Sequence, residues 1–118
     1  MIIVEIYRNK MNDIEKFVIR GHSGYARAGS DIVCAAVSSV SQAAVLGLTE
    51  VLGLKIGLKI EEDSGFKGSG PYLECILPSD LDSNFREKAN ILLQTMFLTI
   101  KSIEEQYSEY VQILEQEV

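Results

Sequence analysis

The sequence predicts an α+β fold, a mixed or antiparallel sheet with two helices packed on one of its faces. Residues 2–8 and 14–20 alternate apolar and polar side chains, a pattern typical of strands. Residues 31–52 and 85–107 instead repeat apolar side chains at intervals of three and four, which is typical of amphipathic helices. With two further strands between the helices, the expected order is ββαββα, and a short final strand can complete it.

The first half of the chain is expected to open with a hairpin whose turn lies at residues 9–13. Residues 23–29 have no periodic apolar pattern and are predicted as a loop. The helix that follows is expected to be capped by Ser30 or Asp31 and to stop at Gly53. Its apolar stripe is formed by Val33, Ala36, Val37, Val40, Ala44, Leu48 and Val51.

The second half is expected to form another hairpin, with strands at 58–62 and 72–77 joined by the glycine-rich segment 63–71. Asp80 or Ser83 is the expected cap of the second helix. The apolar stripe of that helix is formed by Phe85, Ala89, Leu92, Met96, Ile100, Ile103 and Tyr107.

Two further apolar residues, Ile91 and Leu98, lie beside that stripe. They indicate either a helix that buries two of its sides within one subunit or a helix that contributes to a homodimer interface. Residues 111–114 can form the short final strand.

Composition limits the classes of function. A chain of 118 residues with 47% hydrophobic content is expected to form one domain over residues 1–118. The net charge of −6 argues against direct nucleic-acid binding. No apolar stretch is expected to approach membrane-spanning length and the first residues do not resemble a secretory signal, so we expect a cytoplasmic protein without membrane association.

The two cysteines and one histidine offer no metal-ligand spacing, and no metal or organic cofactor is expected. Charge is unevenly distributed along the chain. Residues 1–60 carry seven Lys and Arg against five Asp and Glu, whereas residues 61–118 carry four against twelve. The acidic second half either confers solubility or attracts a cationic partner.

The strongest chemical signal is the segment 21–39, where His22 ends a strand and Cys34 stands near the start of a helix. The positive end of a helix dipole favours a thiolate, and a neighbouring imidazole can accept the thiol proton. A strand end and the start of the next helix commonly meet at one edge of a sheet. His22 and Cys34 therefore form a candidate catalytic pair, although a lone cysteine is as often a packing residue.

If the two side chains meet, the Cys34 thiolate attacks an amide carbonyl, and protonated His22 gives its proton to the departing amine. The N–H groups of Cys34 and Ala35 are candidates for holding the oxyanion. Asp31 can cap the helix or orient the imidazole, and Ser38 lies one turn beyond Cys34 on the same face. Cys75, inside a predicted strand, is expected to be structural.

The same segment, with GH at 21–22, GSD at 29–31 and DIVCAAVS at 31–38, resembles the ribosomal-processing cysteine protease family, called Prp. The likeness extends more loosely, in length and element order, over essentially the whole chain. It adds Gly21 and Gly29 to Asp31, Ala35 and Ser38 as supporting or substrate-binding candidates.

The resemblance implies a cysteine endopeptidase that uses His22 and Cys34. It also implies a substrate, the short N-terminal extension of the twenty-seventh large-subunit ribosomal protein, whose removal supports ribosome assembly. Members of the family form homodimers, so a homodimer is expected here. Two other functions stay open: a non-enzymatic ribosome-associated binding module, and a thiol-dependent amidohydrolase acting on a small molecule.

Overall fold

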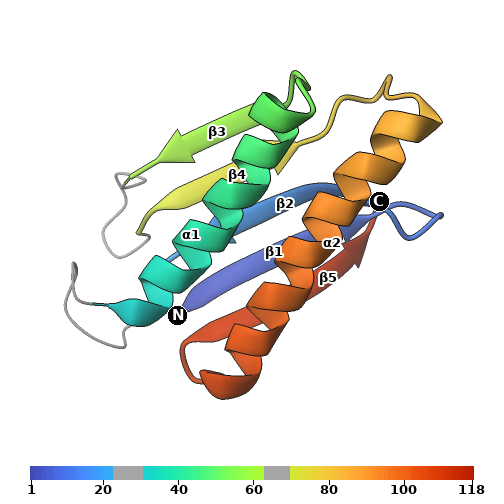
Figure 1. Ribbon diagram of the computed structural model, residues 1–118. Coiled ribbons are helices and arrows are strands. Elements are labelled where there is room, and N and C mark those ends of the chain that lie inside the picture. The colour runs from blue at the N-terminus through green and yellow to red at the C-terminus, as the bar shows by residue number, and fades with distance from the viewer. Residues whose placement is uncertain (23–30, 63–69) are drawn as a thin grey trace.

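The computed structural model describes residues 1–22, 31–62 and 70–118, which form one sheet with two helices on one of its faces (Figure 1). The elements, in chain order, are β1 (Ile2–Arg8), β2 (Ile14–Arg20), α1 (Ile32–Leu46), the π-helical turn η1 (Gly47–Val51), β3 (Gly57–Glu61), β4 (Tyr72–Ile76), α2 (Ser83–Gln106) and β5 (Val111–Glu117). The predicted α+β class and the order ββαββαβ are confirmed.

The sheet is mixed, with the strand order β3-β4-β2-β1-β5. Strands β1 and β2, β2 and β4, and β3 and β4 pair antiparallel, whereas β5 pairs parallel to β1. The last strand is longer than the four residues predicted, because its pairing with β1 continues from Ile2 and Val111 to Arg8 and Glu117.

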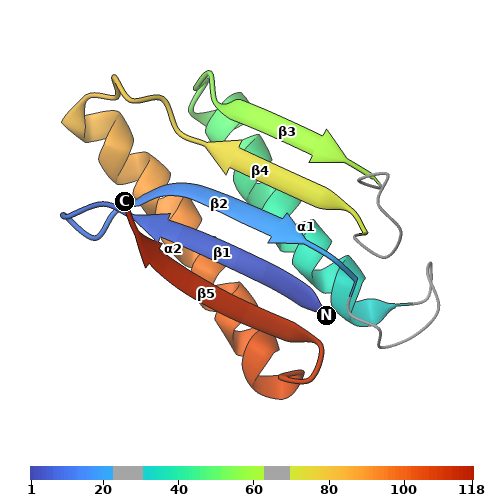
Figure 2. The same cartoon turned by 180° about the vertical axis from the view of Figure 1, so that it is seen from behind.

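Both helices are crossover connections between parallel strands, and this explains why they share a face. The connection β2–α1–β3 runs along the sheet in one direction, and β4–α2–β5 runs in the other from a strand of opposite orientation. Crossovers between parallel strands are almost always right-handed. Two crossovers that run in opposite directions along the sheet, and that start from strands of opposite orientation, therefore place their helices on the same side of the sheet. Figure 2 shows the opposite face without helices.

Helix α1 begins at a buried N-cap residue and packs one narrow face against the sheet. Asp31 is the N-cap, as predicted, and Val33, Val37, Ser41 and Ala44 are the buried residues of the helix. Val51 was expected in the stripe but is 78% exposed, because the wider π-helical turn at Gly47–Val51 shifts it out of the helical register.

The continuous helix Ile32–Val51 is apolar enough, at a mean hydropathy of 1.8, to cross a membrane by length and composition alone. The expectation that no apolar stretch approaches that length is therefore wrong. One third of this apolar stretch is buried inside the protein. The buried residues of the helix recur at intervals of three and four and pack against the core. This pattern is that of an amphipathic helix packed on a sheet.

Helix α2 is capped by Asp82, whose side chain accepts a hydrogen bond from the Phe85 N–H at 2.8 Å. Neither predicted cap, Asp80 nor Ser83, has this role. Its buried residues are Ala89, Leu93, Met96, Phe97 and Ile100. Gly47 lets the two helices approach closely, since a Cβ at that position would lie 2.9 Å from Leu92 Cδ1.

The helix-free face of the sheet is polar. Ion pairs cross it between neighbouring strands, joining Arg20 with Glu5 and Lys16 with Glu74, and Lys16 also stacks on the Tyr7 ring. Cross-strand pairs of opposite charge stabilise a sheet modestly where it meets water. The apolar core therefore lies on the other face, between the sheet and the two helices.

Candidate active site

His22 lies two residues after the end of β2 and is exposed. The turn that presents it depends on Gly21, which has a φ of +92° and donates its N–H to the Pro71 carbonyl at 3.0 Å. A Cβ at Gly21 would overlap the carbonyl oxygen of Met1. Gly21 thus has a conformational role in this structure, because only glycine fits the backbone that places His22.

Cys34 lies in the first turn of α1, where it is partly buried and packs against the core. The buried Asp31 carboxylate fixes that turn by accepting hydrogen bonds from the N–H groups of Val33 and Cys34, each at 3.0 Å. This is the geometry of a strong N-cap. The cysteine is therefore held on a rigid helix start rather than on a loop.

The crossover brings the two candidate catalytic residues to the same end of the molecule. Helix α1 runs back along the sheet after β2, so it must begin near the point where β2 ends. Both views place the end of β2 and the first turn of α1 beside the N-terminus (Figures 1 and 2). The end of β2 and the start of α1 thus lie at the same end of the sheet, in agreement with the arrangement expected from the sequence.

Two of the supporting roles need correction. The Cys34 N–H is bonded to the Asp31 side chain, and the Ala35 N–H donates to the Asp31 carbonyl at 3.1 Å. Both groups are thus used in the helix start, and the structure does not offer them as an oxyanion site. The Asp31 side chain serves as the N-cap, which is one of the two roles predicted for it.

Ser38 lies on the exposed side of α1, one turn after Cys34. Its hydroxyl accepts a hydrogen bond from Gln42 Nε2 at 2.8 Å, and its carbonyl accepts one from the Ser41 hydroxyl. It is accessible for contact with a ligand. Gly29, the remaining supporting candidate, lies outside the described residues, as does the predicted loop from Ser23.

The second cysteine has a different environment. Cys75 is in β4, where it pairs in register with Phe17 of β2 and Leu58 of β3, and it is 1% exposed. Burial raises the pKa of its thiol from the ordinary 9.0 to about 12. A thiol that stays protonated and inaccessible is inert at neutral pH, which agrees with the predicted structural role.

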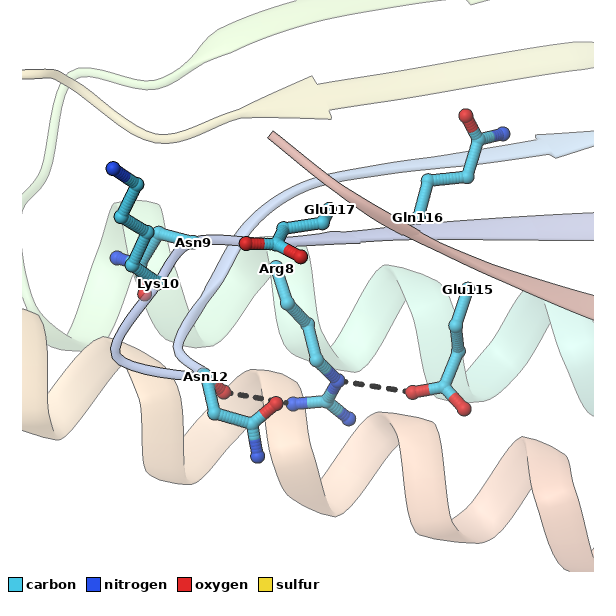
Figure 3. A pocket seen from close by; sticks show the side chains of 7 residues that line it. All are labelled: Arg8, Asn9, Lys10, Asn12, Glu115, Gln116 and Glu117. Carbon is cyan, nitrogen blue, oxygen red and sulfur yellow. Dashed lines mark hydrogen bonds and ion pairs between the residues drawn. The ribbon is translucent and has the colours of Figure 1, made fainter.

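A hollow of about 330 Å³ lies at the end of the sheet where β1 and β5 finish (Figure 3). It is lined by Arg8, Asn9, Lys10, Asn12, Glu115, Gln116 and Glu117. The Arg8 guanidinium is occupied, since it pairs with Glu115 at 3.0 Å, donates to the Asn12 carbonyl and stacks over the Phe97 ring. This hollow is at the opposite end of β1 from Met1 and Gly21.

In the part of the chain that the structure describes, no group of three or more His, Cys, Asp and Glu side chains could hold a metal ion.

Comparison with known proteins decides the family. Residues 1–112 match the family described as Cysteine protease Prp. The chain belongs to the Prp family of cysteine proteases. The part of the sequence that carried the resemblance, residues 21–39, lies within the matched range, and the loose likeness of the remainder is confirmed.

Individual Prp relatives agree with this assignment. The ribosomal processing cysteine protease Prp of Bacillus subtilis is 33% identical over 113 residues, which cover 96% of each chain. The Staphylococcus aureus protein of the same name is 29% identical over 116 residues, covering 96% of this chain and 97% of its own.

Solved structures extend the agreement to the Prp fold. A crystal structure of a Streptococcus mutans protein superposes with a TM-score of 0.81 and 30% identity, covering all of this chain and 96% of the other. The S. aureus Prp protease, solved with a covalently linked product peptide, gives a TM-score of 0.74 and 26% identity over 98% of this chain and all of the other. As a member of the Prp family, the chain is a cysteine protease that acts on a peptide substrate.

Sequence reasoning missed one residue beside His22. Gly70 was grouped with the other glycines of the hairpin tip, but it lies at the start of β4, directly against the imidazole. A Gly-Pro pair immediately before a strand is a signal of a special turn. It does not reveal which side chain the turn will contact.

Proposed function

We propose that this Prp-family protease uses Cys34 as its nucleophile and His22 as its general base and acid. His22 accepts the thiol proton, and the thiolate attacks the scissile carbonyl to give a thioester. The protonated imidazole then gives its proton to the amine that leaves, and water hydrolyses the thioester. The observation that carries the proposal is the delivery of both residues to one end of the sheet by the β2–α1 crossover in a chain of this family.

An apolar surface on the helix side of the sheet supports a peptide substrate. Leu58 and Ile60 of β3 pair in register with Cys75 and Leu73, so their side chains face the helix layer. They are nevertheless 44% and 64% exposed. β3 is also an edge strand, with backbone groups available to an extended chain. We expect apolar side chains of the substrate to bind beside this edge.

The substrate that we propose is the N-terminal extension of the twenty-seventh large-subunit ribosomal protein. The curated relatives are named ribosomal processing proteases, and the S. aureus structures contain a substrate peptide or a covalently linked product peptide. Ribosomal proteins are made in the cytoplasm, where thiols such as that of Cys34 stay reduced. We therefore place the protease in the cytoplasm.

The direct test is incubation of the ribosomal protein precursor with the protease, followed by mass spectrometry of the products. We expect two products, the mature protein and the released extension, because the thioester is formed within one specific peptide bond. The His22→Ala variant should give neither product. An intact precursor that stays bound to the wild-type protein would instead favour a binding module, and turnover of small amides alone would favour an amidohydrolase.

We also propose that the protease forms a homodimer through the outer side of its helix layer. Ile91 and Leu98 of α2 are 60% and 55% exposed, and no charged residue lies between Lys88 and Lys101. Helix α1 has no charged residue from Ile32 to Leu46. This uncharged surface contrasts with the ion-paired face of the sheet and has the composition of a subunit interface.

Light scattering tests the dimer. The wild-type protein should scatter as twice its chain mass of 13.1 kDa. Leu98→Asp should scatter as a monomer, because it places a charge in the centre of the uncharged surface. Met11→Asp is the matched control, since Met11 is an equally apolar and more exposed residue in the β1–β2 turn. A monomeric wild type, or a Leu98→Asp variant that stays dimeric, would contradict the proposal.

A further inference from the structure

Gly70 occupies a restricted position at the start of β4. It is buried, and its φ of +69° lies in the left-handed region that residues with a Cβ rarely adopt. The next residue, Pro71, accepts the hydrogen bond from the Gly21 N–H. Gly70 and Pro71 therefore form the surface of the neighbouring strand on which the Gly21–His22 turn rests.

The contact with His22 is close. A Cβ built on Gly70 would lie 2.9 Å from Cδ2 of the His22 ring, 3.1 Å from Gly21 Cα and 3.2 Å from the Gly21 carbonyl carbon. The first distance is shorter than real Cβ contacts. The two others involve backbone, which can move less easily than the end of a side chain. A side chain at residue 70 would thus displace the imidazole or the turn that carries it.

We infer that Gly70 is a positioning residue for His22: the absence of a side chain at the start of β4 leaves the space in which the imidazole lies. His22 is exposed, and the contact with Gly70 restricts the side on which its ring packs. The inference deepens the proposed function, on which it rests for the catalytic role of His22. Misplacement of a catalytic group by about 1 Å can cost about 10²-fold in rate.

The chain offers a matched control for the test. Gly53 has a φ of +67°, almost the same as that of Gly70, but a Cβ there would have no neighbour within 4 Å. Gly70→Ala and Gly53→Ala therefore impose the same backbone strain. Only the first places an atom against His22. A difference between the two variants reports the contacts with the imidazole and with the Gly21 backbone that carries it, rather than the strain.

Two measurements distinguish a change in the position of the imidazole from a change in the rate of peptide cleavage. The chain has a single histidine, so a proton–carbon NMR spectrum shows one imidazole and assigns it without ambiguity. Gly70→Ala should shift that signal and lower kcat for peptide cleavage by about 10- to 100-fold, with KM within about threefold of wild type. Gly53→Ala should leave the imidazole signal in place and change kcat by less than about twofold.

Gly70→Asn provides a second variant if alanine prevents folding, because asparagine tolerates the left-handed region and still carries a Cβ. An unshifted imidazole signal and unchanged kcat in either folded Gly70 variant would overturn the inference. Failure of the proposed function gives a different result: His22→Ala would cleave the peptide normally, while the imidazole signal of the Gly70 variants would still move.

Discussion

Cys34→Ala should abolish peptide cleavage without unfolding the protein. Removal of a nucleophile typically lowers kcat by far more than the loss of any supporting contact, and we expect kcat/KM to fall by at least about 10³-fold. Alanine suits the first turn of α1, and the substituted side chain is only partly buried, so the free energy of unfolding should change by about 1 kcal/mol or less. Mass spectrometry of the cleavage products measures the first effect, and urea unfolding measures the second.

The second cysteine is the natural control for this result. Cys75→Ala should retain cleavage, because Cys75 lies in the core strand β4. In the wild-type protein at neutral pH, iodoacetamide should label Cys34 and leave Cys75 unmodified until the protein is unfolded. Normal cleavage by Cys34→Ala, or labelling of Cys75 before Cys34 in the native protein, would exclude the nucleophile that we propose.

The thiol of Cys75 should make the protein lose stability at alkaline pH. Its pKa rises on folding from 9.0 to about 12 because the thiolate would be buried. Above pH 9 the unfolded chain therefore releases this proton while the folded protein keeps it. The folded state binds more protons in this range, so the free energy of unfolding falls as the pH rises.

The expected loss is about 1.4 kcal/mol per pH unit between about pH 9 and about pH 12, or about 4 kcal/mol in total, from this one residue. Urea unfolding at pH 8, 9, 10 and 11 measures it as a difference between the wild-type protein and Cys75→Ala. The tyrosines Tyr7 and Tyr72, whose pKa values are also raised, are common to both proteins and cancel. If the free energy of unfolding changed equally with pH in the two proteins, the raised pKa of the Cys75 thiol would be refuted.

Local patterns predicted most of the secondary structure because the main signals are short-range. The alternation of apolar residues gave β1 and β2 with the bounds that the structure has, Ile2–Arg8 and Ile14–Arg20. Helix α1 was predicted through Asp31, a cap that bonds to backbone groups two and three residues away. Each of these features depends on neighbours in the sequence.

The errors arise where distant residues decide the outcome. The full length of β5 depends on β1, which provides its parallel partner. Val51 leaves the apolar stripe because the helix continues as a π-helical turn from Gly47, which packs against Leu92 of the other helix. One error is local instead: the N–H groups of Cys34 and Ala35 were plausible oxyanion donors by position, but the nearby Asp31 already accepts hydrogen bonds from both.

The sequence by itself determined the chemical groups of this protease: one imidazole at the end of a strand and one thiol in the first turn of a capped helix. The sequence led us to expect that the two elements lie together, but only the tertiary structure decided on which face and at which end of the sheet they lie, and that Gly70, 48 residues after His22, lies against the ring. The physical reason is that crossover handedness and strand pairing are set by contacts between segments far apart in the chain. No local pattern contains that information.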